Sequence, residues 1–184
     1  MDFEDFDQEI VAATRGLMDG TLSTLGVVIG AQGAPPEVII AAGISGGIAN
    51  SFSNIFAAFT SYETELMINI NSLKGAMLRK DMTDTEVYEE GKHEVNKQSL
   101  ADGVATAFGA LVPVTPYFFF ETFLSILIAV GLTSILGLFV GLLMGKISRR
   151  SMIRSGLKMA VTAIVVGVIS AFVQSGLSSA LPGG

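Results

Sequence analysis

Long runs of apolar and small residues, separated by short polar connections, dominate the chain. Residues 20–60 carry one charged side chain, Glu37, residues 103–145 carry one, Glu121, and residues 159–184 carry none. A helix that crosses a bilayer needs about 20 consecutive apolar residues with almost no charge, whereas a water-soluble domain spreads charge along every element. The pattern therefore predicts an all-α integral membrane protein.

The apolar runs predict five transmembrane helices, near residues 15–33, 37–61, 102–119, 121–145 and 157–180. Prolines interrupt two places: Pro35 and Pro36 force a sharp turn between the first two spans, and Pro113 and Pro116 end the third span in a tight turn. The predicted organisation is an acidic cytoplasmic N-terminus (1–14), transmembrane helices one and two (15–61), a short cytoplasmic helical insert (62–101), and transmembrane helices three to five (102–184).

The basic residues predict the orientation, because Lys and Arg accumulate in cytoplasmic loops. With the N-terminus in the cytoplasm, all 11 basic residues of the chain are cytoplasmic, and the odd number of spans places the C-terminus outside. The N-terminus is acidic and lacks the features of a secretory signal peptide, so the first span is expected to be retained. No organelle-targeting segment is recognisable, which favours a prokaryotic cell membrane.

The insert between spans two and three is the one sizeable polar segment. Leu66 and Ile70 belong to a series of apolar residues at helical spacing, which predicts that span two continues into the cytoplasm as one helix. Thr83 or Thr85 is positioned to cap a second helix over about 84–98. A segment this short cannot form a domain with its own core. We therefore expect it to pack on the membrane part or on a second copy of the chain.

Asp19 is the first candidate for chemistry. It lies about one helical turn inside the first span, between Gly16 and Gly20, with Arg15 four positions before it. A carboxylate within the bilayer costs about 2.5–3.5 kcal/mol on insertion scales, so it normally faces a partner or a water-filled cavity and marks an ion or proton path. Two alternatives remain open: Asp19 lies on such a path, or it pairs locally with Arg15 near the membrane interface.

Span two adds polar side chains without charge. Asn50 and Asn54 are one helical turn apart on one face, and Gly43, Gly46 and Gly47 allow close helix approach nearby. Amide oxygens are good ligands for hard cations, so both residues are candidate ion ligands. Hydrogen bonding between helices is an equally good explanation of the same pattern.

The insert carries a group of acidic residues and the one histidine of the chain. Glu90 and His93 form a Glu-x-x-His step, a spacing that lets one helix give two ligands to one iron or manganese ion. The alternative is a solvated helix with mixed charge. The candidate metal-binding residues are Glu63, Glu65, Glu86, Glu89, Glu90, His93 and Glu94.

Composition excludes several other classes. The absence of cysteine excludes disulfides, zinc knuckles and thiol nucleophiles. A net charge of −6 and few basic residues disfavour nucleic-acid binding. An intramembrane enzyme is also disfavoured, because the chain has one His and no second acidic group can be placed beside Asp19 from the sequence.

Two Asp-Gly pairs indicate a weak internal repeat. Asp19-Gly20 is followed by Gly26, and Asp102-Gly103 is followed by Gly109 at the same spacing. Two spans per unit would make a parallel repeat, as transporters use. Coincidence in a glycine-rich chain is the alternative.

Two segments together resemble the vacuolar iron transporter family. RGLMDGTLSTLGVVIGA (15–31) is similar to the family's first-span motif, in which an Asp-Gly pair precedes a run of small residues. GALVPVTPYFF (109–119) is similar to its third-span signature, with two prolines before Tyr-Phe. Five spans and an insert between spans two and three agree with this resemblance, which covers nearly the whole membrane portion.

The resemblance implies a homodimer in the lipid bilayer that exports Fe²⁺, Mn²⁺ or both from the cytosol in exchange for protons, with no permanently bound cofactor. Asp19 matches the family's membrane-embedded acidic residue, and the glutamates of the insert would collect the metal ion. The family usually has a Ser-Met step in span two, whereas here Ser53 is followed by Asn54. An oxygen ligand at this position favours a harder ion such as Mn²⁺. The competing hypothesis is a non-transporting membrane adaptor whose cytoplasmic helix pair docks a partner.

Overall fold

The computed structural model describes residues 3–77 and 81–180. Within this range the chain forms five α-helices and one short 3₁₀ helix, and it contains no strand. The elements are α1 (Phe3–Gly30), α2 (Pro36–Met77), α3 (Glu86–Val114), η1 (Thr115–Phe118), α4 (Thr122–Ile147) and α5 (Met152–Ala180). The prediction of an all-α protein is confirmed. Arg79 and Lys80, two of the basic residues predicted to be cytoplasmic, lie outside the described residues.

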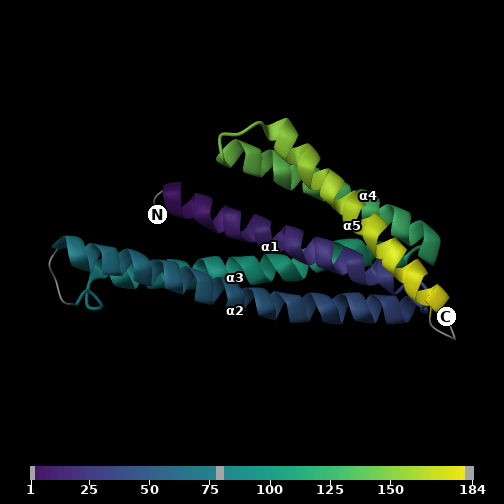
Figure 1. The fold of residues 1–184 in the computed structure, drawn as a ribbon, viewed down its shortest axis with the longest axis horizontal. Helices are drawn as coiled ribbons and strands as arrows, with labels where there is room; N and C mark the ends of the chain where they lie inside the picture. Colours follow the sequence, from purple (N-terminus) through teal and green to yellow (C-terminus); the bar gives the residue numbers. More distant parts are fainter. Residues whose placement is uncertain (1–2, 78–80, 181–184) are drawn as a thin grey trace.

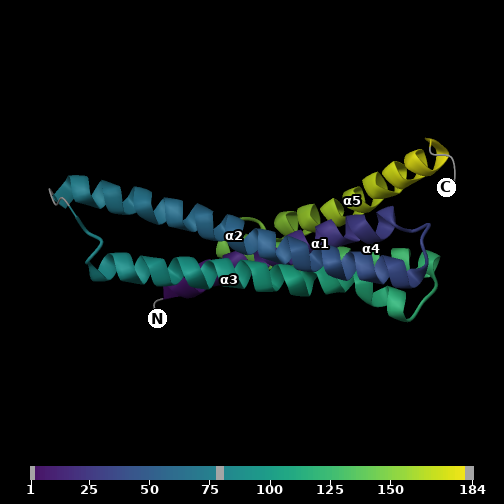
Figure 2. The ribbon, with the colours of Figure 1, turned by 90° about the horizontal axis from the view of Figure 1, so that it is seen from below.

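Three of the described helices, α2, α4 and α5, are long and apolar enough to cross a membrane, judged by length and composition. The helices α1 and α3 also coincide with predicted spans, but they carry polar residues such as Asp19 and Asp102 within those spans. Their positions explain this composition, because α1 contacts each of the other four α-helices and packs most extensively on α3. Figures 1 and 2 show α1 and α3 side by side, flanked by α2 and by the α4–α5 pair.

Helices α1 and α3 run in the same direction and approach each other through glycines. A Cβ atom on Gly16 would overlap the backbone carbonyl of Asp102, and one on Gly20 would overlap that of Thr106. From the other side, a Cβ on Gly109 would overlap the carbonyl of Leu17. Small residues that allow such close backbone contact are typical of helix pairs in membranes. Side chains near this line, including Asp102 and Thr106, are therefore fully buried.

The two Asp-Gly pairs do not occupy equivalent positions in this packing. Gly20 faces α3 at Thr106, whereas Gly103 faces α2, where a Cβ would overlap Ile55. In a symmetric parallel repeat, Gly103 would face α1 as Gly20 faces α3. The geometry therefore favours coincidence over an internal repeat.

The insert is an antiparallel helix pair that extends two membrane helices without a break. As predicted, α2 continues past residue 61, to Met77. Thr85 stands at the N-cap position of the next helix, but its hydroxyl donates to the carbonyl of Met82 and makes no capping hydrogen bond. The prediction that this second helix ends near residue 98 is wrong, because α3 continues to Val114. No proline lies between residues 98 and 102, and an isolated Gly103 does not stop a helix. Leu66 packs against Gly91 to hold the two arms together.

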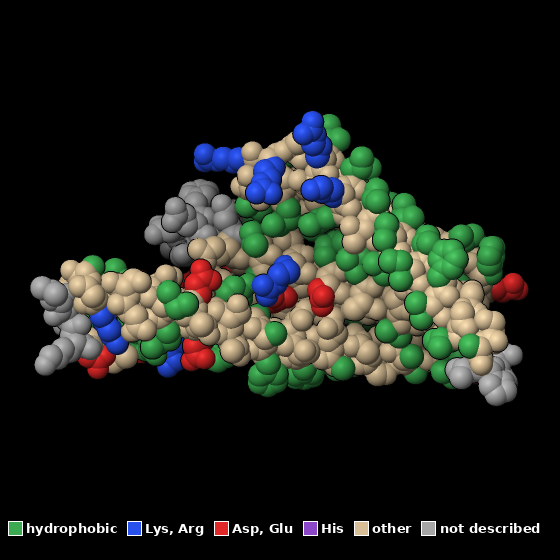
Figure 3. Space-filling view, viewed as in Figure 1, with side chains coloured by type: hydrophobic (Ala, Val, Ile, Leu, Met, Phe, Trp, Pro, Cys, Tyr) green, Lys and Arg blue, Asp and Glu red, His purple; other side chains and the backbone are tan. Residues whose placement is uncertain are grey.

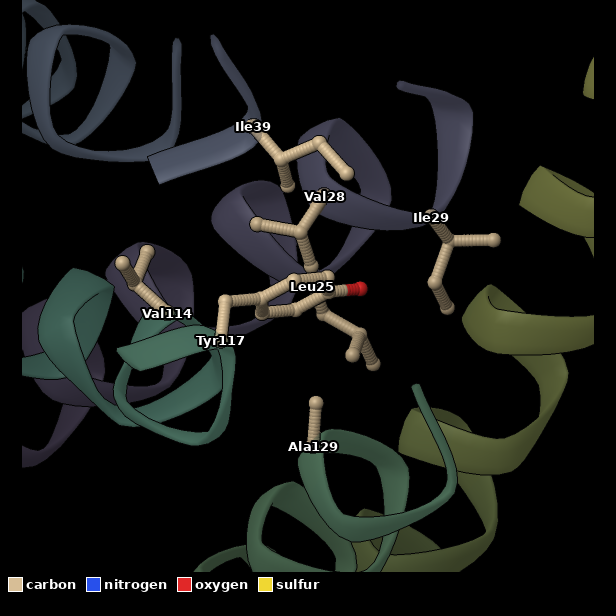
Figure 4. Packing of buried hydrophobic residues seen from close by; sticks show 7 residues of the cluster. All are labelled: Leu25, Val28, Ile29, Ile39, Val114, Tyr117 and Ala129. Carbon is tan, nitrogen blue, oxygen red and sulfur yellow. The ribbon is translucent and has the colours of Figure 1, made fainter. Parts of the chain in front are cut away.

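An apolar cluster joins the elements near the other ends of α1 and α3. Figure 4 shows the ring of Tyr117 from η1 among side chains of three helices and beside Ala129 of α4. The turn into η1 follows Pro113, which lies in the last turn of α3, and it includes Pro116, as predicted. The cluster consists of Leu25, Val28, Ile29, Ile39, Val114, Tyr117 and Ala129. It fixes where α1, α2 and α3 meet the hairpin of α4 and α5.

The termini lie at opposite ends of the molecule. Figure 1 places the N-terminus toward the end that holds the insert, and the C-terminus at the other end. The connection between α4 and α5 lies toward the N-terminal end, and Figure 3 shows Lys and Arg side chains gathered there. The orientation that the positive-inside rule gives this end, toward the cytoplasm, stays a prediction.

Replacing Gly20 by Ala is expected to destabilise the protein, because the added methyl group must push α3 away at Thr106. Overpacking of this kind costs about 1–3 kcal/mol. Gly131→Ala on α4 is the matched control, since nothing lies within 4 Å of a Cβ at that position. Thermal stability in detergent, followed by size-exclusion chromatography, measures both. Equal melting temperatures for the two variants would contradict the glycine contact described above.

Candidate functional site

Asp19 accepts hydrogen bonds from both asparagines of span two. The amide Nδ2 of Asn50 lies 2.7 Å from Asp19 Oδ2, and that of Asn54 lies 3.0 Å from the same oxygen. The one-turn spacing of the two residues on α2 therefore points both amides at one carboxylate on α1. In this arrangement the asparagines act as donors that orient Asp19, and their role as ion ligands stays a prediction.

Each asparagine also contacts a hydroxyl group. Asn50 Nδ2 lies 3.0 Å from Ser23 Oγ on α1, and Asn54 Nδ2 lies 2.9 Å from Thr106 Oγ1 on α3. Thr106 in turn donates to the carbonyl of Asp102 over 2.8 Å. Asn54 thus links three helices, α1, α2 and α3, at the level of Asp19. A polar network within a membrane protein is expected at a functional site.

Arg15 forms an ion pair with Asp102 of α3 rather than with Asp19 among the described residues. The Asp102 side chain is 1% exposed, whereas that of Arg15 is 54% exposed. The guanidinium of Arg15 also lies over the ring of Tyr62 on α2, 5.6 Å from its centroid. This geometry argues against the alternative that Asp19 merely pairs with Arg15.

These charged side chains line one cavity of about 300 Å³. Its lining includes Asp19, Arg15, Asp102 and Asn54, and the small residues Ala57, Ala58 and Ser61 of α2 complete the wall. Two carboxylates, one guanidinium and one amide thus face a space large enough for a cation with several waters. Such a set of oxygen atoms suits a hard or borderline divalent cation.

A second cavity of about 300 Å³ lies next to the first, toward the insert. Glu65 and Tyr62 of α2 line it together with Gln8 and Gln98. Tyr62 connects the two spaces, since its ring lies against Arg15, which lines the first cavity. One of the predicted metal-binding glutamates, Glu65, therefore lines a cavity next to the one that holds Asp19.

The other acidic residues of the insert do not converge. Glu63, Glu86, Glu89, Glu90 and His93 are exposed, and Glu94 pairs with Lys97 over 3.6 Å. Across the described part of the chain, no group of three or more His, Asp or Glu side chains lies close enough to hold one metal ion. Their role as metal ligands remains a prediction.

Sequence reasoning missed Asp102. It is separated from Arg15 by 87 positions, and nothing in the local pattern shows that the two side chains meet. No second acidic group could be placed beside Asp19 from the sequence, whereas the structure brings Asp102 to the lining of the same cavity. One signal was available: an acidic residue at the beginning of an otherwise uncharged span needs a partner.

Comparisons with known proteins agree with this architecture. The model of the VIT family matches residues 64–175, which include nearly the whole insert and most of the last three spans. The chain is also 39% identical, over 163 residues, to an uncharacterised protein of the archaeon Methanocaldococcus jannaschii. That match covers 87% of this chain and 85% of the relative. The chain therefore belongs to the VIT family, the vacuolar iron transporter family, and is an integral membrane protein of a family of metal-ion transporters.

Proposed function

We propose that this protein exports a divalent transition metal ion, Fe²⁺, Mn²⁺ or both, from the cytosol in exchange for protons. The observation that carries the proposal is the cavity in which Asp19 lies with Asn54 and a second carboxylate, between helices of a VIT family member. An exposed, hydrogen-bonded carboxylate at such a depth can bind a cation and, after its release, a proton.

The proposed topology has five spans, with the N-terminus in the cytoplasm and the C-terminus outside, in a prokaryotic cell membrane. Helices α2, α4 and α5 have the composition of spans. Helices α1 and α3 serve as spans because their polar side chains are paired: Arg15 with Asp102, and Asp19 with two asparagine amides. Opposite positions of the two termini support an odd number of crossings.

The proposed path begins at the acidic insert. Exposed glutamates lower the electrostatic potential at the cytoplasmic face and raise the local concentration of divalent cations. The ion then passes the cavity beside Glu65 and the ring of Tyr62, and reaches Asp19 and Asn54. In the proposed homodimer, a second copy faces this cavity, and the ion leaves along the subunit boundary.

Asp19 is proposed to couple metal export to the proton gradient. Its two amide donors are neutral, so the carboxylate can exchange a metal ion for a proton without breaking an ion pair of its own. Binding must also be weak enough for the ion to leave. Hydrogen-bond donors that compete with the metal for Oδ2 serve this requirement.

Asp19→Asn is expected to reduce metal transport to the level of empty liposomes while dimer assembly stays intact, because the amide cannot carry the negative charge. Flux of Fe²⁺ and Mn²⁺ into proteoliposomes, with a pH dye inside, measures both metal and proton movement. Asp84→Asn in the exposed turn of the insert makes the same chemical change away from the proposed path and serves as the control. Normal export by Asp19→Asn would overturn the proposal, and absence of flux in a well-folded wild-type dimer would favour the adaptor.

Joint replacement of Glu86, Glu90 and His93 by Ala is expected to weaken metal binding by about tenfold, equivalent to about 1.4 kcal/mol. Titration calorimetry with Mn²⁺ on the full-length protein is the measurement. The control replaces Asn69, Asn71 and Ser72, three exposed uncharged residues on the other arm of the insert. If both triple variants bind Mn²⁺ like the wild type, the glutamates belong to an ordinary solvated helix.

Asn54→Met is expected to shift transport from Mn²⁺ toward Fe²⁺, because a thioether replaces an amide beside Asp19 and is the softer ligand. The ratio of the two fluxes, measured anaerobically in the same proteoliposomes, reports the shift. Asn96→Met makes the same exchange at an exposed position of the insert. An unchanged ratio in Asn54→Met would show that residue 54 does not select the ion.

A further inference from the structure

Asp102 has only half of its carboxylate satisfied by the protein. The residue is fully buried, and Oδ2 forms the ion pair with Arg15, but Oδ1 has no hydrogen-bond partner among the described residues. Buried carboxylate oxygens are normally satisfied, because an unpaired one keeps the whole cost of its desolvation. Asp102 lines the same cavity as Asp19. Oδ1 lies against Gly16 and has almost no access to solvent, so among the described residues the charge of Asp102 is compensated only at Oδ2, by Arg15.

Gly16 makes room for the unpartnered oxygen. A Cβ atom at Gly16 would lie 2.6 Å from Asp102 Oδ1, and no side chain could be added there without displacing the carboxylate. The same residue therefore permits the approach of α1 to α3 and the position of Asp102 at the wall of the cavity. The hydrogen bonds of Asp19 do not depend on Gly16, because their donors come from α2.

Arg15 is the exposed partner of the ion pair. Its side chain is 54% exposed while Asp102 is held within the helix pair at 1%. The guanidinium already lies 5.6 Å from the centroid of the Tyr62 ring, and aromatic rings attract cations. Beyond Tyr62 lies the cavity that Glu65 lines. The ring of Tyr62 is therefore a partner of the guanidinium besides Asp102.

The charge balance of the cavity depends on this ion pair. With Arg15 in place, the formal charges of Asp19, Asp102 and Arg15 leave one net negative charge. Once Arg15 leaves Asp102, the two carboxylates together match the charge of a divalent cation. A monovalent cation would compensate only one of the two carboxylates, which is unfavourable because Asp102 is buried.

We propose that Asp102 is a second carboxylate ligand of the transported cation and that Arg15 is an internal cation that neutralises Asp102 until a divalent metal ion replaces it. The inference rests on the function proposed above. It assigns to Arg15 the role of a built-in competitor, so that the affinity for the metal is kept moderate and the two carboxylates favour divalent over monovalent cations.

Binding of Mn²⁺ to the full-length protein in detergent, measured by the loss of the free-ion signal in electron paramagnetic resonance, tests the proposal. Four variants are compared with the wild type: Arg15→Gln, Asp102→Asn, the double variant Arg15→Gln/Asp102→Asn, and Asp19→Asn. We expect Arg15→Gln to bind Mn²⁺ about tenfold more tightly, and Asp102→Asn to bind it about tenfold more weakly. The double variant should lose the gain produced by Arg15→Gln and bind more weakly than the wild type.

The double variant controls for misfolding, because it removes both charges and leaves no unpaired buried carboxylate. If the ion pair only fastens α1 to α3, Arg15→Gln will not bind Mn²⁺ more tightly, and the folded double variant will bind Mn²⁺ like the wild type. That result would overturn this inference and leave the proposed function standing. A wild-type protein that binds no Mn²⁺ and moves none overturns the proposed function as well. A competition series with Na⁺ adds a second readout, since Arg15→Gln should raise the preference for Mn²⁺.

Discussion

The contact between α1 and α3 is the constraint on which the rest of the structure depends. Gly16, Gly20 and Gly109 bring the two backbones together so closely that no side chain fits between them. Parallel packing at this distance carries Asp102 to the level of Arg15 and Thr106 to the level of Asn54. In a bilayer, where lipid tails compete with side chains for apolar contact, close backbone packing and interhelical hydrogen bonds are the main forces that hold such a pair.

The position of polar residues follows from this central pair. Helix α1 contacts every other α-helix, so its charged side chains can meet residues of several helices. Asp19 accepts from two asparagines of α2, and Arg15 reaches across to α3. Helices α4 and α5 pack against each other through Gly137 and Gly141 and supply the apolar side of the fold. The polar side chains of the site thus lie between α1, α2 and α3, while α4 and α5 are apolar over most of their length.

Much of the fold could be predicted from the sequence, because individual residues determine where its helices and turns lie. The absence of charge over long runs identified α2, α4 and α5, and the prolines at 35, 36, 113 and 116 located two turns. Asp19 was recognisable because a carboxylate in an apolar run is costly. Asp102 was not, since its role depends on which helix lies beside it, and neither spacing nor composition gives the neighbours of a helix. The same limit applies to the insert: its helical pattern was predictable, whereas the convergence of its glutamates depends on tertiary contacts.

Helix α2 is much longer than a single membrane crossing requires. Its 42 residues make a rod of about 63 Å, roughly twice the thickness of the hydrocarbon core of a membrane. No proline interrupts it between Asn50 and Met77, so no proline kink separates the asparagines from the far end of α2. The two amides that hold Asp19 and one whole arm of the insert therefore belong to a single continuous helix.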